Sequence, residues 1–224
     1  YVQIQTKSSI DAKTIKVLNP KEVVFEGGRE LELDAVSEVP RYYVCNAYGV
    51  CGIYSAPGTA VKEAYDTSGI VTNDRGVTVW LKGNRVSRNQ IMAIKEESVT
   101  EQKNSLAVCL DNILRHAGIT RNTEYDLAQG KTVTTILSEN MTGVQVLDLS
   151  GCTLDAVLYY VNQDIPVLAI LEDGEAVLVT GFNEFNVVIM EPATGKLYKK
   201  GMNDATAWFA ENGNHFITYM RIEN

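Results

Sequence analysis

Apolar positions in the carboxy-terminal half of the chain recur first with helical spacing and then with strand spacing. Leu106, Cys109, Leu110, Ile113 and Leu114 share one helical face, which predicts an amphipathic helix that ends at Gly118. Further helices are predicted at residues 123–130, 132–140, 153–163 and 204–212, and strands at 144–149, 166–171, 176–182, 186–190 and 216–221. Helices followed by consecutive strands favour an α+β domain with an antiparallel sheet.

The preceding part of the chain alternates polar and apolar residues and predicts mainly strands. It predicts a ββαββ unit with strands at 41–45, 50–54, 69–72 and 77–81 and a short helix at 60–65. Ser55 or its neighbour is the predicted N-cap of this helix, with Pro57 near the first turn. Trp80, in the last strand of the unit, is expected to pack against the helix.

Three regions follow from these patterns. Residues 1–40 form a β-rich segment, residues 41–95 the ββαββ module, and residues 98–224 the α+β domain. The first region has strand patterns at 14–18, 22–25 and 29–36. A polar, charged run at 96–103 separates the last two regions, and the basic run at 82–89 is interpreted as a solvated linker, with an acidic partner or a glycan as the alternative.

The composition of the chain disfavours several classes of function. The chain has 224 residues, is 45% hydrophobic and carries a formal net charge of -8, which favours a globular protein and disfavours nucleic-acid binding. Its apolar runs, such as 165–171, are much shorter than the roughly 20 residues that span a bilayer. Glycine-rich phosphate motifs are absent from the sequence, so no cofactor is expected.

The four cysteines do not form a metal-binding pattern. Cys45, Cys51, Cys109 and Cys152 include no Cys-x-x-Cys pair, and the two histidines lie far from them in the sequence, so no metal site is expected. Cys45 and Cys51 flank the turn of the first predicted hairpin, so they could face each other across it. We interpret them as free cysteines on a half-buried ribbon, with a disulfide as the alternative.

Three stretches of the α+β domain match one family pattern. Residues 104–114 match a first helix, residues 174–182 a strand of the type Gly-His-Ala-Val-x-x-x-Gly-Tyr, and residues 187–192 a strand that ends in Asp-Pro. Residues 213–217 fit the closing strand. The domain thus resembles the papain-like cysteine peptidases that process bacteriocin leaders, the double-glycine peptidase type. The resemblance implies a papain-like fold, in which an N-terminal helix packs on an antiparallel sheet.

The catalytic positions of this family hold other side chains here. The resemblance places Ser105 where the family has its nucleophilic Cys, Glu175 where it has the His base, and Glu191 where it has the orienting Asp. Gln102 is a candidate for the oxyanion glutamine, but it lies three residues before Ser105, where the family has a longer gap. A carboxylate of ordinary pKa is a poor base for a hydroxyl. Ser105 is therefore interpreted as a helix N-cap, and no catalytic residue is expected.

Cys109 is the alternative nucleophile, paired with His215 or His116. Cys109 lies seven residues after Gln102, close to the family spacing, but it is on the apolar stripe, where a thiol is buried and inert. His116 ends the first helix, where a cation suits the helix dipole. His215, at the entry of the last strand, is interpreted as a surface or edge residue.

These observations favour a non-catalytic peptidase-like protein that acts in binding or as a scaffold and holds a peptide or protein in a remnant cleft. The alternatives are an active cysteine peptidase that uses Cys109, and a structural surface module in which residues 41–95 bind the partner. The resemblance implies a bacterial protein that is secreted or displayed on the cell surface.

Overall fold

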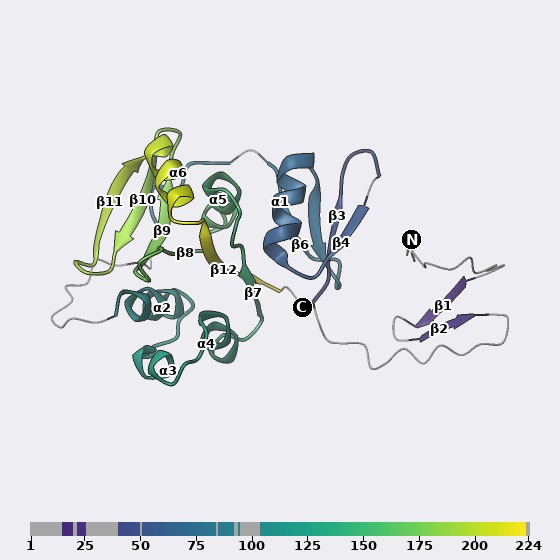
Figure 1. Cartoon of the computed structure of the whole chain (residues 1–224), viewed down its shortest axis with the longest axis horizontal. Helices are drawn as coiled ribbons and strands as arrows, with labels where there is room; N and C mark the ends of the chain where they lie inside the picture. Colours follow the sequence, from purple (N-terminus) through teal and green to yellow (C-terminus); the bar gives the residue numbers. More distant parts are fainter. Residues whose placement is uncertain are drawn as a thin grey trace. The chain divides into compact units, whose positions relative to one another are not determined.

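The computed structural model describes residues 15–19, 22–25, 40–49, 51–83, 85–91, 94 and 104–222. The chain divides into two units, residues 1–39 and residues 40–224. In the first unit, β1 (Ile15–Asn19) and β2 (Glu22–Phe25) pair in antiparallel fashion (Figure 1). The strand predicted at 29–36 and the candidate oxyanion residue Gln102 lie outside the described residues.

The second unit contains a six-stranded antiparallel sheet (Figure 1). Its strands in spatial order are β11 (Lys196–Gly201), β10 (Asn186–Glu191), β9 (Ala176–Phe182), β8 (Val167–Ile170), β12 (His215–Arg221) and β7 (Val144–Asp148). All seven residues of β9 are buried. Because neighbouring side chains of a strand point to opposite faces, β9 must be covered on both faces.

Helices supply this cover. Both α2 (Ser105–His116) and α5 (Leu154–Asn162) contact β9. The other helices of this part are α3 (Glu124–Ala128), α4 (Val133–Asn140), which contacts β7, and α6 (Met202–Glu211), which contacts β10 and β11. This mixture of helices and antiparallel strands agrees with the predicted α+β class.

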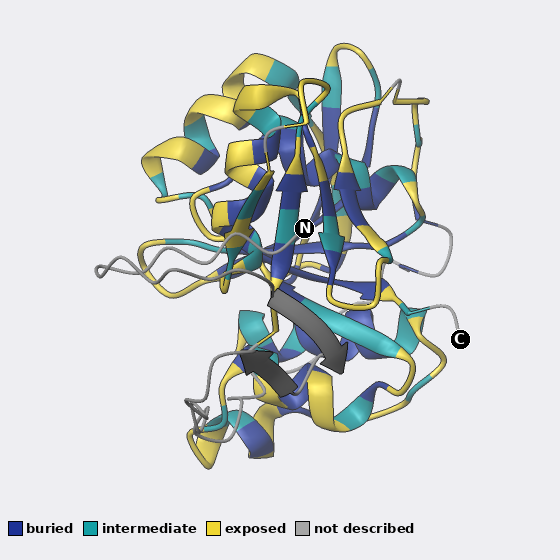
Figure 2. Cartoon of the chain, turned by 90° about the vertical axis from the view of Figure 1, so that its right-hand side faces the viewer, coloured by how far each residue is buried: buried dark blue, intermediate teal, exposed yellow. Residues whose placement is uncertain are grey.

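The ββαββ unit forms a second, four-stranded sheet with one helix. The order is β4 (Cys51–Tyr54), β3 (Tyr42–Cys45), β5 (Ile70–Asn73) and β6 (Thr78–Leu81), and α1 (Pro57–Thr67) contacts all four strands. One hydrophobic core includes residues from this unit and from the six-stranded sheet, and Figure 2 shows the buried residues in dark blue along the strands and the inner sides of the helices. The division at 96–103 lies outside the described residues and stays a prediction.

Hydrogen bonds of buried groups join this unit to α5. The indole Nε1–H of Trp80 donates to the carbonyl of Ala156 at 3.0 Å, and the hydroxyl of Tyr160 donates to the carbonyl of Val79 at 3.1 Å. The Trp80 ring also lies beside that of Tyr65 on α1, with 6.1 Å between centroids. Trp80 therefore packs against α1, as predicted, and against α5 as well.

Of two local predictions in this unit, one was confirmed and one was wrong. The N-cap of α1 is Ala56, the neighbour of Ser55; it makes no side-chain hydrogen bond, and Pro57 opens the helix with a backbone already suited to it. Cys45 and Cys51 are not free but form a disulfide. They are directly paired across β3 and β4, so their Cβ atoms lie close enough for a bond.

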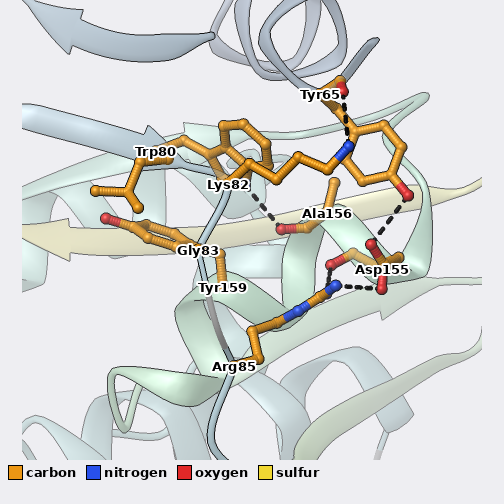
Figure 3. A pocket seen from close by; sticks show the side chains of 9 residues that line it. Tyr65, Trp80, Lys82, Gly83, Arg85, Asp155, Ala156 and Tyr159 are labelled. Carbon is orange, nitrogen blue, oxygen red and sulfur yellow. Dashed lines mark hydrogen bonds and ion pairs between the residues drawn. The ribbon is translucent and has the colours of Figure 1, made fainter. Parts of the chain in front are cut away.

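The basic run at 82–89 is not a solvated linker, because its two arginines pair with acids of the domain. Arg85 binds Asp155 on α5, and Arg88 donates to Asp164 Oδ1 at 2.7 Å. Figure 3 shows Arg85 and the hydroxyl of Tyr65 meeting the same Asp155 carboxylate, beside a cavity of about 20 Å³ that has room for roughly one water. These contacts hold the segment along α5.

Candidate functional site

The first turn of α2 carries Ser105, the position that the sequence resemblance assigned to the catalytic Cys. Ser105 is the first residue of the helix and not its cap, which corrects the prediction. The cap is Asn104, whose Oδ1 accepts a hydrogen bond from Leu106 N at 2.9 Å. Since Asn is as good a cap as Ser, the hydroxyl of Ser105 is left for another partner.

That partner belongs to β9. The Oγ of Ser105 accepts a hydrogen bond from the backbone N–H of Ala176 at 3.0 Å. Ala176 follows Glu175, so the structure brings the two predicted positions Ser105 and Glu175 together although they are 70 residues apart in the sequence. Glu175 is exposed, and its N–H donates to Asp173 Oδ1 at 2.9 Å within the turn between β8 and β9.

Glu191 lies at the same end of the sheet, on the neighbouring strand. Met190 pairs with Leu178, which places the end of β10 beside the start of β9. The side chain of Glu191 is exposed, and its Oε2 accepts a hydrogen bond from the hydroxyl of Thr194 at 2.8 Å. This contact directs the carboxylate into the turn between β10 and β11.

Cys109 lies one turn further along α2, in the core. It is completely buried, and burial raises the pKa of its thiol far above the usual range, with the nearby negative charge of Glu175 as a second cause. The other free cysteine, Cys152, is also buried, its thiol contacts the carbonyl of Gly58, and burial raises its pKa to about 12. A thiol in such surroundings stays protonated at neutral pH and is a weak nucleophile.

His116 is a buried, uncharged residue, which corrects its interpretation as a cation at the end of the helix. Its side chain is 4% exposed, and burial lowers its pKa, although the charge of Asp164 acts in the opposite direction. Its Nδ1 lies 2.9 Å from the hydroxyl of Tyr219, and its Nε2 lies 3.6 Å from Asp164 Oδ2. Seven residues along α2 separate it from Cys109, a rise of about 10 Å.

His215 is exposed at the start of β12. It pairs with Ile170 on β8, and Ile170 pairs with Ala176 on β9, so His215 lies two strands away from the backbone that Ser105 binds. Two strand spacings are about 10 Å. Among the described residues, no hydrogen bond links either histidine to Ser105 or Cys109, and no group of three potential metal ligands is present.

Sequence reasoning missed the network around His116. Asp164 stands in the left-handed region at φ 65, which an Asp tolerates better than most residues, and from there its carboxylate reaches both Arg88 and His116. Positive charges at 82–89 in an acidic chain were a signal that these side chains have specific partners. Identifying the acids required the fold, because Asp164 lies 76 residues away from Arg88.

Comparisons with known proteins support the fold. No protein-family model matches the chain, and no curated protein matches it. A solved structure from Bacillus anthracis, described as that of a candidate C39-like peptidase, matches with a TM-score of 0.52 and 13% sequence identity. The match covers 62% of this chain and 100% of the other. At this identity the likeness concerns the fold alone, and part of the chain has an architecture that is consistent with the papain-like fold.

Proposed function

We propose that the peptidase-like domain is non-catalytic and that it binds a peptide or protein segment in a remnant cleft beside Ser105 and Glu175. The observation that carries the proposal is the hydrogen bond from Ala176 N–H to Ser105 Oγ, because the sequence resemblance assigned Ser105 to the position of a peptidase's thiol. The adjacent Glu175 is a carboxylate, which is a poor base for a serine hydroxyl at neutral pH. A nucleophile without a matched base has little activity.

The buried state of Cys109 supports this proposal over an active cysteine peptidase. Its thiolate is disfavoured by burial and by Glu175, and its helical position is separated by two turns from His116. A working peptidase needs the thiol and the imidazole within about 3–4 Å of each other.

The exposed carboxylates of Glu175 and Glu191 at one end of the sheet favour a segment with basic residues as the bound partner.

The test combines peptide cleavage, thiol labelling and binding with the full chain. We expect no cleavage of a basic peptide mixture, no labelling of Cys109 by an electrophilic peptide probe unless the protein is unfolded, and saturable binding of basic peptides that Glu175→Gln weakens. Lys199→Gln, on the far strand β11, is the control. Cleavage that is abolished by Cys109→Ala or Ser105→Ala would overturn the non-catalytic assignment, and absence of binding would overturn the peptide-binding role.

We also propose that the protein works outside the cytoplasm. The disulfide between Cys45 and Cys51 on exposed positions of β3 and β4 supports this, since such bonds persist in oxidising compartments. Among the helices of the described residues, none is both long and apolar enough to cross a membrane. Alkylation of whole cells before and after reduction, followed by mass measurement, tests the proposal: free thiols at both positions in native cells would contradict it.

A further inference from the structure

A second candidate site lies at the opposite end of α2 from Ser105, about 16 Å along the helix axis. A pocket of about 540 Å³ lies there between the end of α2, the turn from α4 to β7 and the end of β12. Its volume falls in the range of pockets that hold small organic ligands. Its apolar lining consists of Ala117, Ile119, Met141, Val144 and Ile222.

Two polar side chains of this pocket are buried and held in place. His116 and Tyr219 both line it, their side chains are almost completely buried, and the imidazole Nδ1 and the phenol oxygen are 2.9 Å apart. Asp164 lies 3.6 Å from the other ring nitrogen, so it favours a proton there, and the phenol then donates to Nδ1. Such fixed polar groups orient a ligand with little loss of side-chain entropy.

The charge of the pocket favours an anion. Arg221 lines it and is exposed, and burial leaves His116, the other titratable base of the lining, neutral. The nearby Asp164 does not line the pocket, and its charge is compensated by Arg88 at 2.7 Å. The final carbonyls of α2 are already bonded by the N–H groups of residues 118 and 119, which reduces the negative potential at the helix end.

We propose that this pocket binds a small organic carboxylate with an apolar body. The guanidinium of Arg221 pairs with the carboxylate, because its planar donors match the two oxygens of that group. The apolar body lies against Ile119, Met141 and Val144. This assignment is independent of the role proposed for the site beside Ser105, since the two sites share no residue.

The experiment is a titration of the full chain, followed by amide NMR signals, with N-acetyl-leucine as the probe and N-acetyl-leucinamide as its neutral counterpart. We expect the carboxylate to shift the signals of Gly143, Val144 and Ile222 saturably, and to bind about tenfold more tightly than the amide, as for the loss of one charge-assisted hydrogen bond. Arg221→Gln should remove this preference, and Lys199→Gln on β11 should keep it.

Three results would overturn the proposal. The first is the absence of a saturable shift of the amide signals at about 10 mM probe, which corresponds to a binding free energy weaker than about 3 kcal/mol. The second is equal binding of the acid and the amide by the natural chain, a comparison that does not depend on any variant folding. The third is binding that Arg221→Gln leaves unchanged, or signal shifts that map outside the pocket.

Discussion

Gly181 is the position at which a single added methyl group should be least tolerated. It lies in β9 where residues 88–91 run beside the strand, and a Cβ built on it would lie 2.6 Å from the carbonyl oxygen of Asn89 and 2.7 Å from that of Arg88. Real Cβ contacts are essentially never shorter than 3.0 Å, so the backbone of this segment must move by about 0.3–0.4 Å. Both atoms belong to the main chain, which cannot rotate away as a flexible side chain can.

This movement acts on the bonds that hold the segment to β9. The N–H of Phe182 donates to Arg88 O at 2.6 Å, Arg88 N–H donates to Phe182 O at 3.0 Å, and Ile91 N–H donates to Thr180 O at 2.8 Å. Weakening two such bonds costs about 1–3 kcal/mol, and overpacking itself typically costs about 1–3 kcal/mol. We expect Gly181→Ala to lower the free energy of unfolding by about 2–4 kcal/mol.

Urea unfolding followed by tryptophan fluorescence measures this loss. Gly83→Ala is the matched control, because its nearest contact is Leu81 Cδ1 at 3.0 Å, the end of a side chain that can rotate. The control should change stability by less than about 1 kcal/mol. If Gly181→Ala is as stable as the natural chain, or if both variants lose the same amount, the close approach of the segment to β9 is refuted.

Three further predictions concern single contacts. Ser105→Ala should cost about 1 kcal/mol of unfolding free energy through its lost hydrogen bond, measured by urea unfolding; a gain in stability would contradict that contact. Asp155→Asn should cost about 1 kcal/mol, because the pair with Arg85 is partly exposed, and the difference from the natural chain should shrink in 1 M salt; a salt-independent loss would contradict the ion pair. The pKa of His116 is lowered from 6.5 in the folded state, so its contribution to stability is present above about pH 6.5 and is lost as the pH falls toward the folded pKa. We therefore expect the unfolding free energy of His116→Gln to fall less steeply than that of the natural chain between about pH 7 and 5. Equal slopes of unfolding free energy against pH would refute the buried neutral state.

Periodicity predicted much of the fold because each element buries one face. The apolar stripe from Leu106 to Leu114 predicted α2, and the largely apolar runs at 167–170 and 176–182 predicted two central strands. These patterns are local, and they do not depend on the partner that covers them. The disulfide was assigned wrongly because spacing alone does not show whether two cysteines of a hairpin occupy paired positions; the register of β3 and β4 does.

Contacts between distant residues explain what the sequence did not show. The ion pairs of Arg85 and Arg88 join positions 70 and 76 residues apart, and a charged residue in isolation is usually solvated. The N-cap of α2 was placed one residue too late because Asn104 and Ser105 are both good caps. This shift by one residue matters for Ser105. Because Asn104 caps the helix, the hydroxyl of Ser105 is left to accept the hydrogen bond from Ala176 N–H.

The candidate site then follows from this register. A residue at the first position of a helix projects its side chain beside the helix end, and here β9 supplies a backbone N–H at hydrogen-bonding distance. The contact fixes α2 to the start of β9, so the two positions remain together. Glu175 adds a negative charge that further disfavours a thiolate at Cys109. A framework that opposes the reactive form of the nearest thiol supports the proposal that this domain binds without cleaving.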